Sequence, residues 1–226
     1  MELIKVKNLV KTFQNGDKET HVLKGIDFSC GDGEFIAIMG RSGAGKSTFM
    51  YQISLLDEPT SGEIVVFDKN THSMTSEEKT KFRLNKLGYV FQDYALLPDL
   101  TAVENVAVPL MMQGKSKREA YIEAKVALEL VGLGHRFDNL PSQMSGGEQQ
   151  RTSIARALAH KPRILFADEP TANLDNESSK TIMELFKQVH DSGQTIIMVT
   201  HEEEYSKLAK RVIRLDDGRI ISDQRQ

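Results

Sequence analysis

One stretch of the chain has the residue types and spacing needed to bind phosphate. Residues 40–47 read Gly-Arg-Ser-Gly-Ala-Gly-Lys-Ser, which fits the P-loop pattern G-x-x-x-x-G-K-[ST]. Glycines let the backbone turn its N–H groups inward, the lysine can reach the terminal phosphates, and the last hydroxyl can bind Mg²⁺. The alternative is a glycine-rich turn that binds nothing. The predicted nucleotide contacts are Gly40, Arg41, Ser42, Gly43, Ala44, Gly45, Lys46, Ser47 and Thr48.

Two adjacent carboxylates could complete the chemistry. Asp168 and Glu169 directly follow the apolar run 164–167. One carboxylate can hold Mg²⁺ through water while the other orients or deprotonates an attacking water. Adjacent Asp and Glu are common on solvated loops, so their position after an apolar run is what makes them informative. We expect Ser47 and Asp168 to be metal ligands and Glu169 to be catalytic.

Continuous apolar runs predict the elements that position these groups. The runs 35–39, 87–91, 164–167 and 195–199 each end at a glycine or a polar residue. Unbroken hydrophobicity is typical of strands buried on both faces of a parallel sheet, whose ligands bind beyond the carboxyl ends of the strands. We therefore expect Gln92, Asp168, Glu169, His201 and the Gly40 loop to meet in one crevice. For His201 the alternative is a solvated histidine at a strand end.

The remaining segments indicate an α/β fold with two additions. Thr75, Thr101 and Ser116 each precede a glutamate by three residues, which matches the capping box at a helix start. Residues 93–160 contain no convincing buried strand and predict an inserted helical lobe. In this lobe Ile122, Val126 and Leu130 form one apolar stripe, widened by Ala124, Ala127, Leu128 and Val131, that is expected to end at Gly132. Short or alternating apolar runs within residues 3–67 favour an N-terminal antiparallel β layer.

Composition limits the function classes. The 226 residues carry 29 Lys and Arg against 32 Asp and Glu, so the net charge of -3 provides no overall basic field for nucleic acid. The single cysteine, Cys30, cannot form an internal disulfide, and no leader-like segment opens the chain, which favours a reducing cytosol. The longest apolar run, 106–112, is far shorter than the roughly 20 residues that span a bilayer. We expect a chain that does not enter a membrane by itself.

A second motif points to a family. Residues 144–148 read Met-Ser-Gly-Gly-Glu, which resembles the Leu-Ser-Gly-Gly-Gln signature of the ATP-binding cassette (ABC) ATPases, and the motifs follow that family's order. The resemblance implies one ABC ATPase domain over residues 1–226, with a P-loop NTPase (RecA-like) core at 1–92 and 161–226 and the lobe at about 93–160. It assigns Gln92 to the Q-loop and the metal, residues 172–175 with Asp175 to the D-loop, His201 to the switch position, and Phe13 to adenine stacking.

The resemblance also implies a mechanism. ATP and Mg²⁺ are the expected cofactors, Lys46, Glu169 and His201 the expected catalytic residues, and Ser145, Gly146 and Gly147 the groups that close each ATP in a second subunit. The chain is thus expected to form a homodimer around two ATP molecules. From the residues alone, the segment 145–148 is also an ordinary capping box, and Phe13 could be packing in a β core.

Glu148 departs from the family pattern, in which glutamine is commoner. It places a carboxylate near a phosphate, although a capping carboxylate can turn back towards its own helix end.

The role of the ATPase is inferred from what the chain lacks. Relatives acting on DNA carry a long coiled coil between the two motifs, ribosome-acting relatives usually carry two cassettes, and a P-loop kinase would leave the second motif unexplained. We expect an ABC transporter subunit, peripheral on the inner face of the cell membrane through a separate permease and binding no nucleic acid. Residues 56–63 and 88–106 resemble the MacB/LolD group, which serves lipoprotein release, macrolide or peptide efflux and antimicrobial-peptide resistance. Amino-acid importers share much of the sequence of these two segments, so an importer ATPase is the alternative.

The apolar residues that follow Gln92 have two interpretations. Tyr94, Leu96, Leu97 and Leu100 could form part of a groove for the permease, or they could be internal core of the lobe.

Overall fold

Two units of tertiary structure make up the chain. The computed structural model describes residues 1–16 and 18–226, and no side chain is described at residue 15. The first unit comprises residues 1–83 and 195–226, and the second comprises residues 84–194. The predicted lobe boundaries, 93 and 160, both fall inside the second unit.

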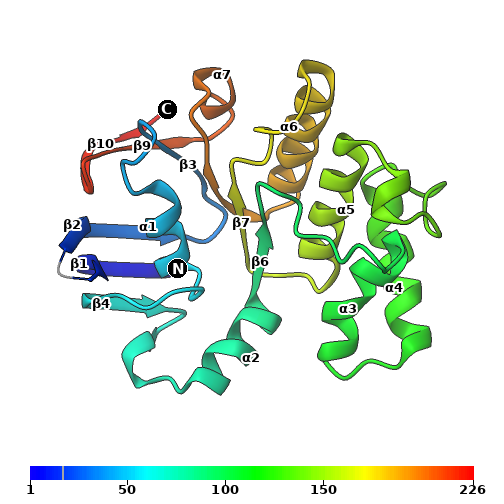
Figure 1. The fold of residues 1–226 in the computed structure, drawn as a ribbon, viewed down its shortest axis with the longest axis horizontal. Coiled ribbons are helices and arrows are strands. Elements are labelled where there is room, and N and C mark those ends of the chain that lie inside the picture. The colour runs from blue at the N-terminus through cyan, green and yellow to red at the C-terminus, as the bar shows by residue number, and fades with distance from the viewer. Residues whose placement is uncertain (17) are drawn as a thin grey trace. The chain divides into compact units, whose positions relative to one another are not determined.

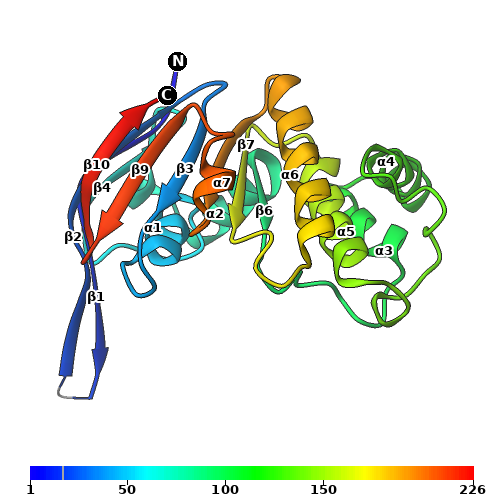
Figure 2. The ribbon, with the colours of Figure 1, turned by 90° about the horizontal axis from the view of Figure 1, so that it is seen from above.

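An antiparallel β layer begins the first unit. Its strands, in sheet order β2-β1-β4-β5, are β2 (Lys18–Gly31), β1 (Glu2–Asn15), β4 (Ser61–Val66) and β5 (Lys69–Asn70). Figure 2 shows β1 and β2 as a long hairpin. The antiparallel layer was predicted, but its first strands are longer than the apolar runs indicated. Residues 18–21, in the outer part of β2, are exposed and polar, so they carry no hydrophobic signal.

The loops of the first unit that carry predicted site residues start from buried parallel strands. β3 (Phe35–Met39) pairs in parallel with β8 (Thr195–Val199) and with β9 (Arg211–Asp216), and β10 (Arg219–Arg225) pairs with β9 in antiparallel register. Every residue of β3 and β8 is buried, as the unbroken apolar runs predicted. The chain continues from β3 through residues 40–45 into α1 (Lys46–Ile53), and from β8 through His201 into α7 (Glu203–Ser206).

A two-residue turn joins β9 to β10. Asp217 and Gly218 both have positive φ, 42° and 73°, as the favoured type I′ hairpin turn requires. Glycine is required at 218 because a Cβ there would lie 2.3 Å from the carbonyl oxygen of Val22.

The only cysteine of the sequence lies in β2. Cys30 is fully buried, and its thiol lies near the carboxylate of Glu34. Burial, followed by that negative charge, raises the pKa of the Cys30 thiol to about 12.

Helices dominate the second unit. β6 (Leu87–Val90) and β7 (Ile164–Asp168) pair in parallel, as predicted. The helices that lie wholly in this unit are α3 (Ala102–Met112), α4 (Lys117–Leu130), η2 (Pro141–Gln143), α5 (Gly146–Ala159) and α6 (Asn176–Asp191). α2 (Ser76–Lys86) crosses the boundary between the units in sequence and follows the short η1 (Thr71–Ser73). Figure 1 shows α3, α4 and α5 as neighbours, and these helices pack on one another.

Sequence signals located the helix starts correctly. Thr101 and Ser116 form the predicted capping boxes with Glu104 and Glu119, and Thr75 with Glu78 does the same before α2. Gly132 follows α4 with a φ of 74°, as expected for the residue that ends a helix.

Only part of the apolar stripe predicted on α4 faces the core. Ile122, Val126 and Leu130 are 57%, 61% and 61% exposed. The buried face carries Ala120, Ala124, Ala127 and Leu128 instead. Two apolar faces share this helix, and the alanine-rich one packs against α3 and α5 because small side chains let helices approach closely. The prediction was therefore wrong for Ile122, Val126 and Leu130 and right for the residues that widen the stripe, Ala124, Ala127, Leu128 and Val131.

Within the part of the chain that the structure describes, no helix has the length and apolar character needed to cross a bilayer.

Candidate functional site

The phosphate loop, residues 40–47, has a backbone conformation that requires glycine at two positions, 40 and 45. Gly40 has a φ of 154°, and a Cβ there would lie 2.3 Å from the carbonyl oxygen of Leu215. Gly45 has a φ of 96°, and a Cβ there would lie 3.1 Å from the carbonyl oxygen of Val22. The turn between β9 and β10 supports the loop from behind, because Gly218 N–H donates to the carbonyl of Ala44 at 3.1 Å.

The lysine of the loop is held inside it. Lys46 is buried, and its ammonium donates to the carbonyls of Gly40 at 3.0 Å and Arg41 at 3.2 Å. α1 starts at this lysine without a side-chain cap and without an acidic residue in its first turn. Its first N–H groups and the positive end of its dipole therefore favour an anion. The lysine and the helix start together suit a polyphosphate, and Ser47 adds a hydroxyl in the first turn.

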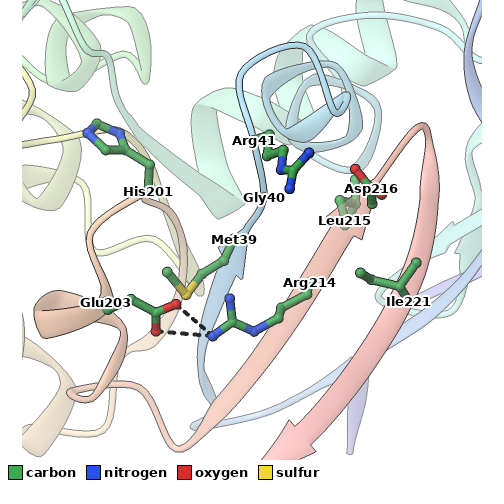
Figure 3. A pocket seen from close by; sticks show the side chains of 9 residues that line it. All are labelled: Met39, Gly40, Arg41, His201, Glu203, Arg214, Leu215, Asp216 and Ile221. Carbon is green, nitrogen blue, oxygen red and sulfur yellow. Dashed lines mark hydrogen bonds and ion pairs between the residues drawn. The ribbon is translucent and has the colours of Figure 1, made fainter.

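His201 lies in the same cavity as the start of the phosphate loop. A cavity of about 440 Å³ in the first unit is lined by Gly40, Arg41 and His201 among others (Figure 3). The ends of β3 and β8, which pair in parallel, bring these residues together. The predicted convergence of the loop and the histidine is thus seen within this unit. Glu203 and Arg214 line the cavity too, and Arg214 donates to both carboxylate oxygens of Glu203 at 2.8 and 3.0 Å.

Phe13 is a surface aromatic residue. It lies on β1 and is 44% exposed, and the ammonium of Lys11 is 4.9 Å from its ring centroid. The ring is not part of a buried core, so the packing alternative does not describe it. An accessible ring face is what stacking on a base needs.

The two candidate carboxylates occupy different environments in the second unit. Asp168 is the last residue of β7 and is buried, whereas Glu169 is partly exposed. Glu169 has a φ of 43°, which is uncommon for a residue with a side chain and costs free energy. Strained backbone of this kind is concentrated at functional sites. Behind the pair, the side chain of buried Gln150 donates to the carbonyl of Pro170 at 2.7 Å and ties α5 to this turn.

Three predicted motifs of the second unit contact one another. The side chain of Asn173, in the predicted D-loop, donates to the carbonyl of Gln92 at 2.9 Å. Tyr94, two residues after Gln92, donates its hydroxyl to the carbonyl of Asn173 at 3.4 Å. A Cβ on Gly146 would lie 2.9 Å from that same hydroxyl. The Q-loop, D-loop and signature segments are therefore one packed cluster, and glycine at 146 is what allows the tyrosine to approach.

The signature segment begins α5 through a complete capping box. Ser145 is the N-cap and accepts a hydrogen bond from Glu148 N–H, while the Glu148 carboxylate accepts one from Ser145 N–H at 2.8 Å. That carboxylate also accepts from Arg136 at 2.8 Å. The Ser145 N–H bond, with Arg136 beside it, holds the pKa of Glu148 below its usual range. The structure thus agrees with the sequence argument that Glu148 turns back towards its own helix end.

Asp175 has a structural task of its own. It is the N-cap of α6 and accepts hydrogen bonds from the N–H and the hydroxyl of Ser178, both at 2.9 Å. These bonds lower the pKa of the Asp175 carboxyl. The nucleotide role expected for Asp175 remains a prediction.

Sequence reasoning missed two positioning residues. Gln150 lies two residues after the quoted signature but carries no motif, and Arg156, on the same helix, donates to the carbonyls of Tyr94 and Ala95. Their partners are 20 and 61–62 residues away in sequence, so no local pattern marks them.

Comparison with known protein families matches residues 23–172, well over half of the chain, to the family described as ABC transporter. The chain belongs to the ABC transporter family. The expected fold and the expected ATPase activity are thereby confirmed.

ABC relatives cover nearly the whole chain. An uncharacterized ABC transporter ATP-binding protein of Methanocaldococcus jannaschii, MJ1508, is 46% identical over 97% of this chain and 98% of its own length. The lipoprotein-releasing system ATP-binding protein LolD of Aquifex aeolicus is 42% identical over 98% and 97%.

Other ABC matches concern a longer protein and a solved structure. The macrolide export ATP-binding/permease protein MacB of Aggregatibacter actinomycetemcomitans is 46% identical over 99% of this chain, which spans 35% of that protein. Among solved structures, the dimeric post-hydrolysis state of the ATP-binding cassette MJ0796 bound to ADP and Pi has a TM-score of 0.91 and 40% identity, with 98% of both chains covered.

Proposed function

We propose that this ABC ATPase works as a homodimer that encloses two ATP molecules and drives a separate integral membrane permease. The observation that carries the proposal is the phosphate loop: its first residues, Gly40 and Arg41, line one cavity with His201, and its buried Lys46 begins the uncapped helix α1. A homodimer is supported by the dimeric structure of the cassette MJ0796. A membrane partner is supported by LolD and MacB, whose names describe lipoprotein release and macrolide export with a permease. Peripheral attachment to the inner face of the membrane follows from such a partner.

The roles of the residues follow from their chemistry. The loop N–H groups and Lys46 bind the phosphates, His201 contacts the γ-phosphate, and Phe13 stacks on adenine. Glu169 positions the attacking water and takes its proton, which is commonly worth about 10²–10⁴-fold in rate. The segment of Ser145, Gly146 and Gly147, in which Ser145 is exposed, closes the ATP bound by the second copy, because the N-terminus of a helix favours a phosphate.

The proposed Mg²⁺ ligands fit that ion. Ser47 offers a hydroxyl, Gln92 an amide oxygen and Asp168 a carboxylate, and Mg²⁺ prefers such oxygen donors, often through water. The described residues contain no group of three or more His, Cys, Asp or Glu that could hold a metal, and the proposed set does not need one because phosphate oxygens supply further ligands. When bound, Mg²⁺ would neutralise charge on the phosphates.

Substitution of the proposed base tests the function. We expect Glu169→Gln to bind ATP as the wild type does, to accumulate as an ATP-bound dimer, and to hydrolyse ATP at least about 10²-fold more slowly. The matched control is Glu184→Gln, which removes an exposed carboxylate of α6. ATP turnover measures the rate of hydrolysis, and light scattering detects the accumulated dimer. Near-normal turnover in Glu169→Gln would contradict the assignment of the base.

The permease surface can be tested separately. Leu97 is exposed in the second unit, whereas Tyr94, Leu96 and Leu100 are half-buried, so the alternative of an internal core does not describe Leu97. We propose that these four residues contact the permease. Leu97, 47% exposed, is the residue to change: Leu97→Asp should abolish co-purification of an untagged membrane partner and leave basal ATP turnover intact. Recovery of DNA or ribosomes in place of a membrane protein would overturn the transport role.

A further inference from the structure

The segment that carries His201 has little local stability of its own. α7, which follows it, is a single turn of four residues, and its N-cap, Glu202, makes no side-chain capping bond. A helix this short does not form without tertiary contacts. Upstream, the bonds that fix the segment include one from Thr200 N–H to the Ile38 carbonyl at 3.1 Å and one from Glu202 N–H to the Thr200 hydroxyl at 3.1 Å.

One ion pair fixes the segment from the other side. Glu203, the first residue of α7, receives two hydrogen bonds from one guanidinium nitrogen of Arg214, at 2.8 and 3.0 Å (Figure 3). Arg214 belongs to β9, and its register partner is Met39, the last residue of β3. The arginine is therefore anchored beside the residue that leads into Gly40, and it reaches towards the segment that follows β8.

The Arg214–Glu203 ion pair links the start of the phosphate loop to the segment that carries His201. Arg214 starts next to the phosphate loop, Glu203 lies two residues after His201, and all of these residues line the same cavity. A charge-assisted pair fixes orientation as well as distance. Both side chains are largely exposed, at 44% and 64%, so the pair contributes little to overall stability. Its effect is confined to the local order of a short segment.

We propose that Arg214 and Glu203 are positioning residues that hold His201 at the distance from the phosphate loop that hydrolysis requires. The inference rests on the role proposed for His201 at the γ-phosphate. Neither side chain needs to touch ATP. They act through the backbone of residues 201–203, so loss of the pair should slow turnover without weakening nucleotide binding.

The test separates kcat from KM in matched variants. Arg214→Gln and Glu203→Gln should each lower kcat by roughly threefold to tenfold with unchanged KM for ATP, a typical effect of a residue that acts through another. The exchanged pair, Glu203→Arg with Arg214→Glu, should recover most of the lost rate. The control is Arg225→Gln, which breaks a different exposed ion pair, with Glu34, and should leave kcat unchanged. Equal kcat in wild type, Arg214→Gln and Glu203→Gln would overturn the proposal.

The variant His201→Ala distinguishes the role proposed for His201 from the positioning role proposed for Arg214 and Glu203. If His201→Ala hydrolyses ATP normally, the proposed role of His201 fails and the positioning role fails with it. If His201→Ala is slow but Arg214→Gln is not, only the positioning role fails. The decisive measurement is the combination of His201→Ala with Arg214→Gln, which should be no slower than His201→Ala alone. A further loss of the same size as in the wild-type background would show that Arg214 acts independently of His201 and would overturn the proposal.

Discussion

Glu148 offers a quantitative test of how the signature helix is held. Its carboxylate accepts from Ser145 N–H and from Arg136, both at 2.8 Å, and its side chain is only 12% exposed. Glu148→Ala removes both interactions. Loss of a capping bond costs about 1 kcal/mol. The ion pair adds about 0.5–1 kcal/mol because Arg136 is 36% exposed and partly screened by water.

The two substitutions at this position should therefore differ in size. Glu148→Ala is expected to lower the free energy of unfolding by about 1.5–2 kcal/mol, which corresponds to a drop in Tm of roughly 3–8 °C for a chain of this length. Glu148→Gln keeps an oxygen for Ser145 N–H and loses only the charge, so it should lose about 0.5–1 kcal/mol. Basal ATP turnover should be unchanged in Glu148→Gln, since the carboxylate faces its own helix.

The pH dependence has a definite sign. The native pKa of Glu148 lies below the ordinary value of 4.5, so the charged form is the one that the fold stabilises. Its contribution is fully present above pH 4.5 and is lost as the pH falls through the lowered pKa. Urea unfolding of wild type and Glu148→Gln should show a stability difference at pH 7 that shrinks below pH 4.5. A Gln variant as stable as the wild type at pH 7, or an Ala variant no worse than the Gln variant, would refute this reasoning.

Three further predictions concern Gly218, Asn105 and Phe13. Gly218→Ala should lower the free energy of unfolding by about 2–4 kcal/mol and weaken ATP binding, because its Cβ would clash with a carbonyl and its N–H supports the phosphate loop. The control Gly33→Ala, with nearly the same φ and open space around it, should cost about 1 kcal/mol in urea unfolding. Buried Asn105 bonds four backbone groups of residues 97–101, so Asn105→Ala should lose about 2–4 kcal/mol by the same measurement, and a smaller loss than that of Gly33→Ala would contradict the prediction. Phe13→Ala should raise the Kd for ATP about tenfold in a fluorescent-nucleotide assay with little change in Tm, and Phe13→Tyr should not; equal Kd values in both variants would argue against stacking.

Local sequence patterns predicted what depends on local physics. The phosphate loop, the buried strands around it and the caps at Thr101, Ser116 and Ser145 each follow from a few neighbouring residues. The stripe on α4 shows where this reasoning stops: Ile122 and Ala120 lie on competing faces, and the choice between them depends on helices distant in sequence.

Contacts between distant residues were beyond the sequence argument for a similar reason. Asn173 reaches Gln92 across 81 residues, and the approach of Tyr94 to Gly146 depends on three loops being in place. Spacing motifs identified each segment of this cluster, yet none of them contains information on how the segments bond. The Arg214–Glu203 pair is similar, because β9 and α7 become neighbours only through the order of the strands.

The buried cysteine described above does not have to be removed before a second cysteine is introduced for site-specific labelling. Only the thiolate reacts with maleimides or nitroxide reagents. Because burial raises the pKa of Cys30 to about 12, its thiol stays protonated at the pH of labelling, and its sulfur is shielded from reagent as well. A cysteine introduced at an exposed position, such as Lys210→Cys, would therefore be labelled selectively in the otherwise native sequence. Distances between two such labels could then report on the opening and closing of the proposed dimer during the ATP cycle.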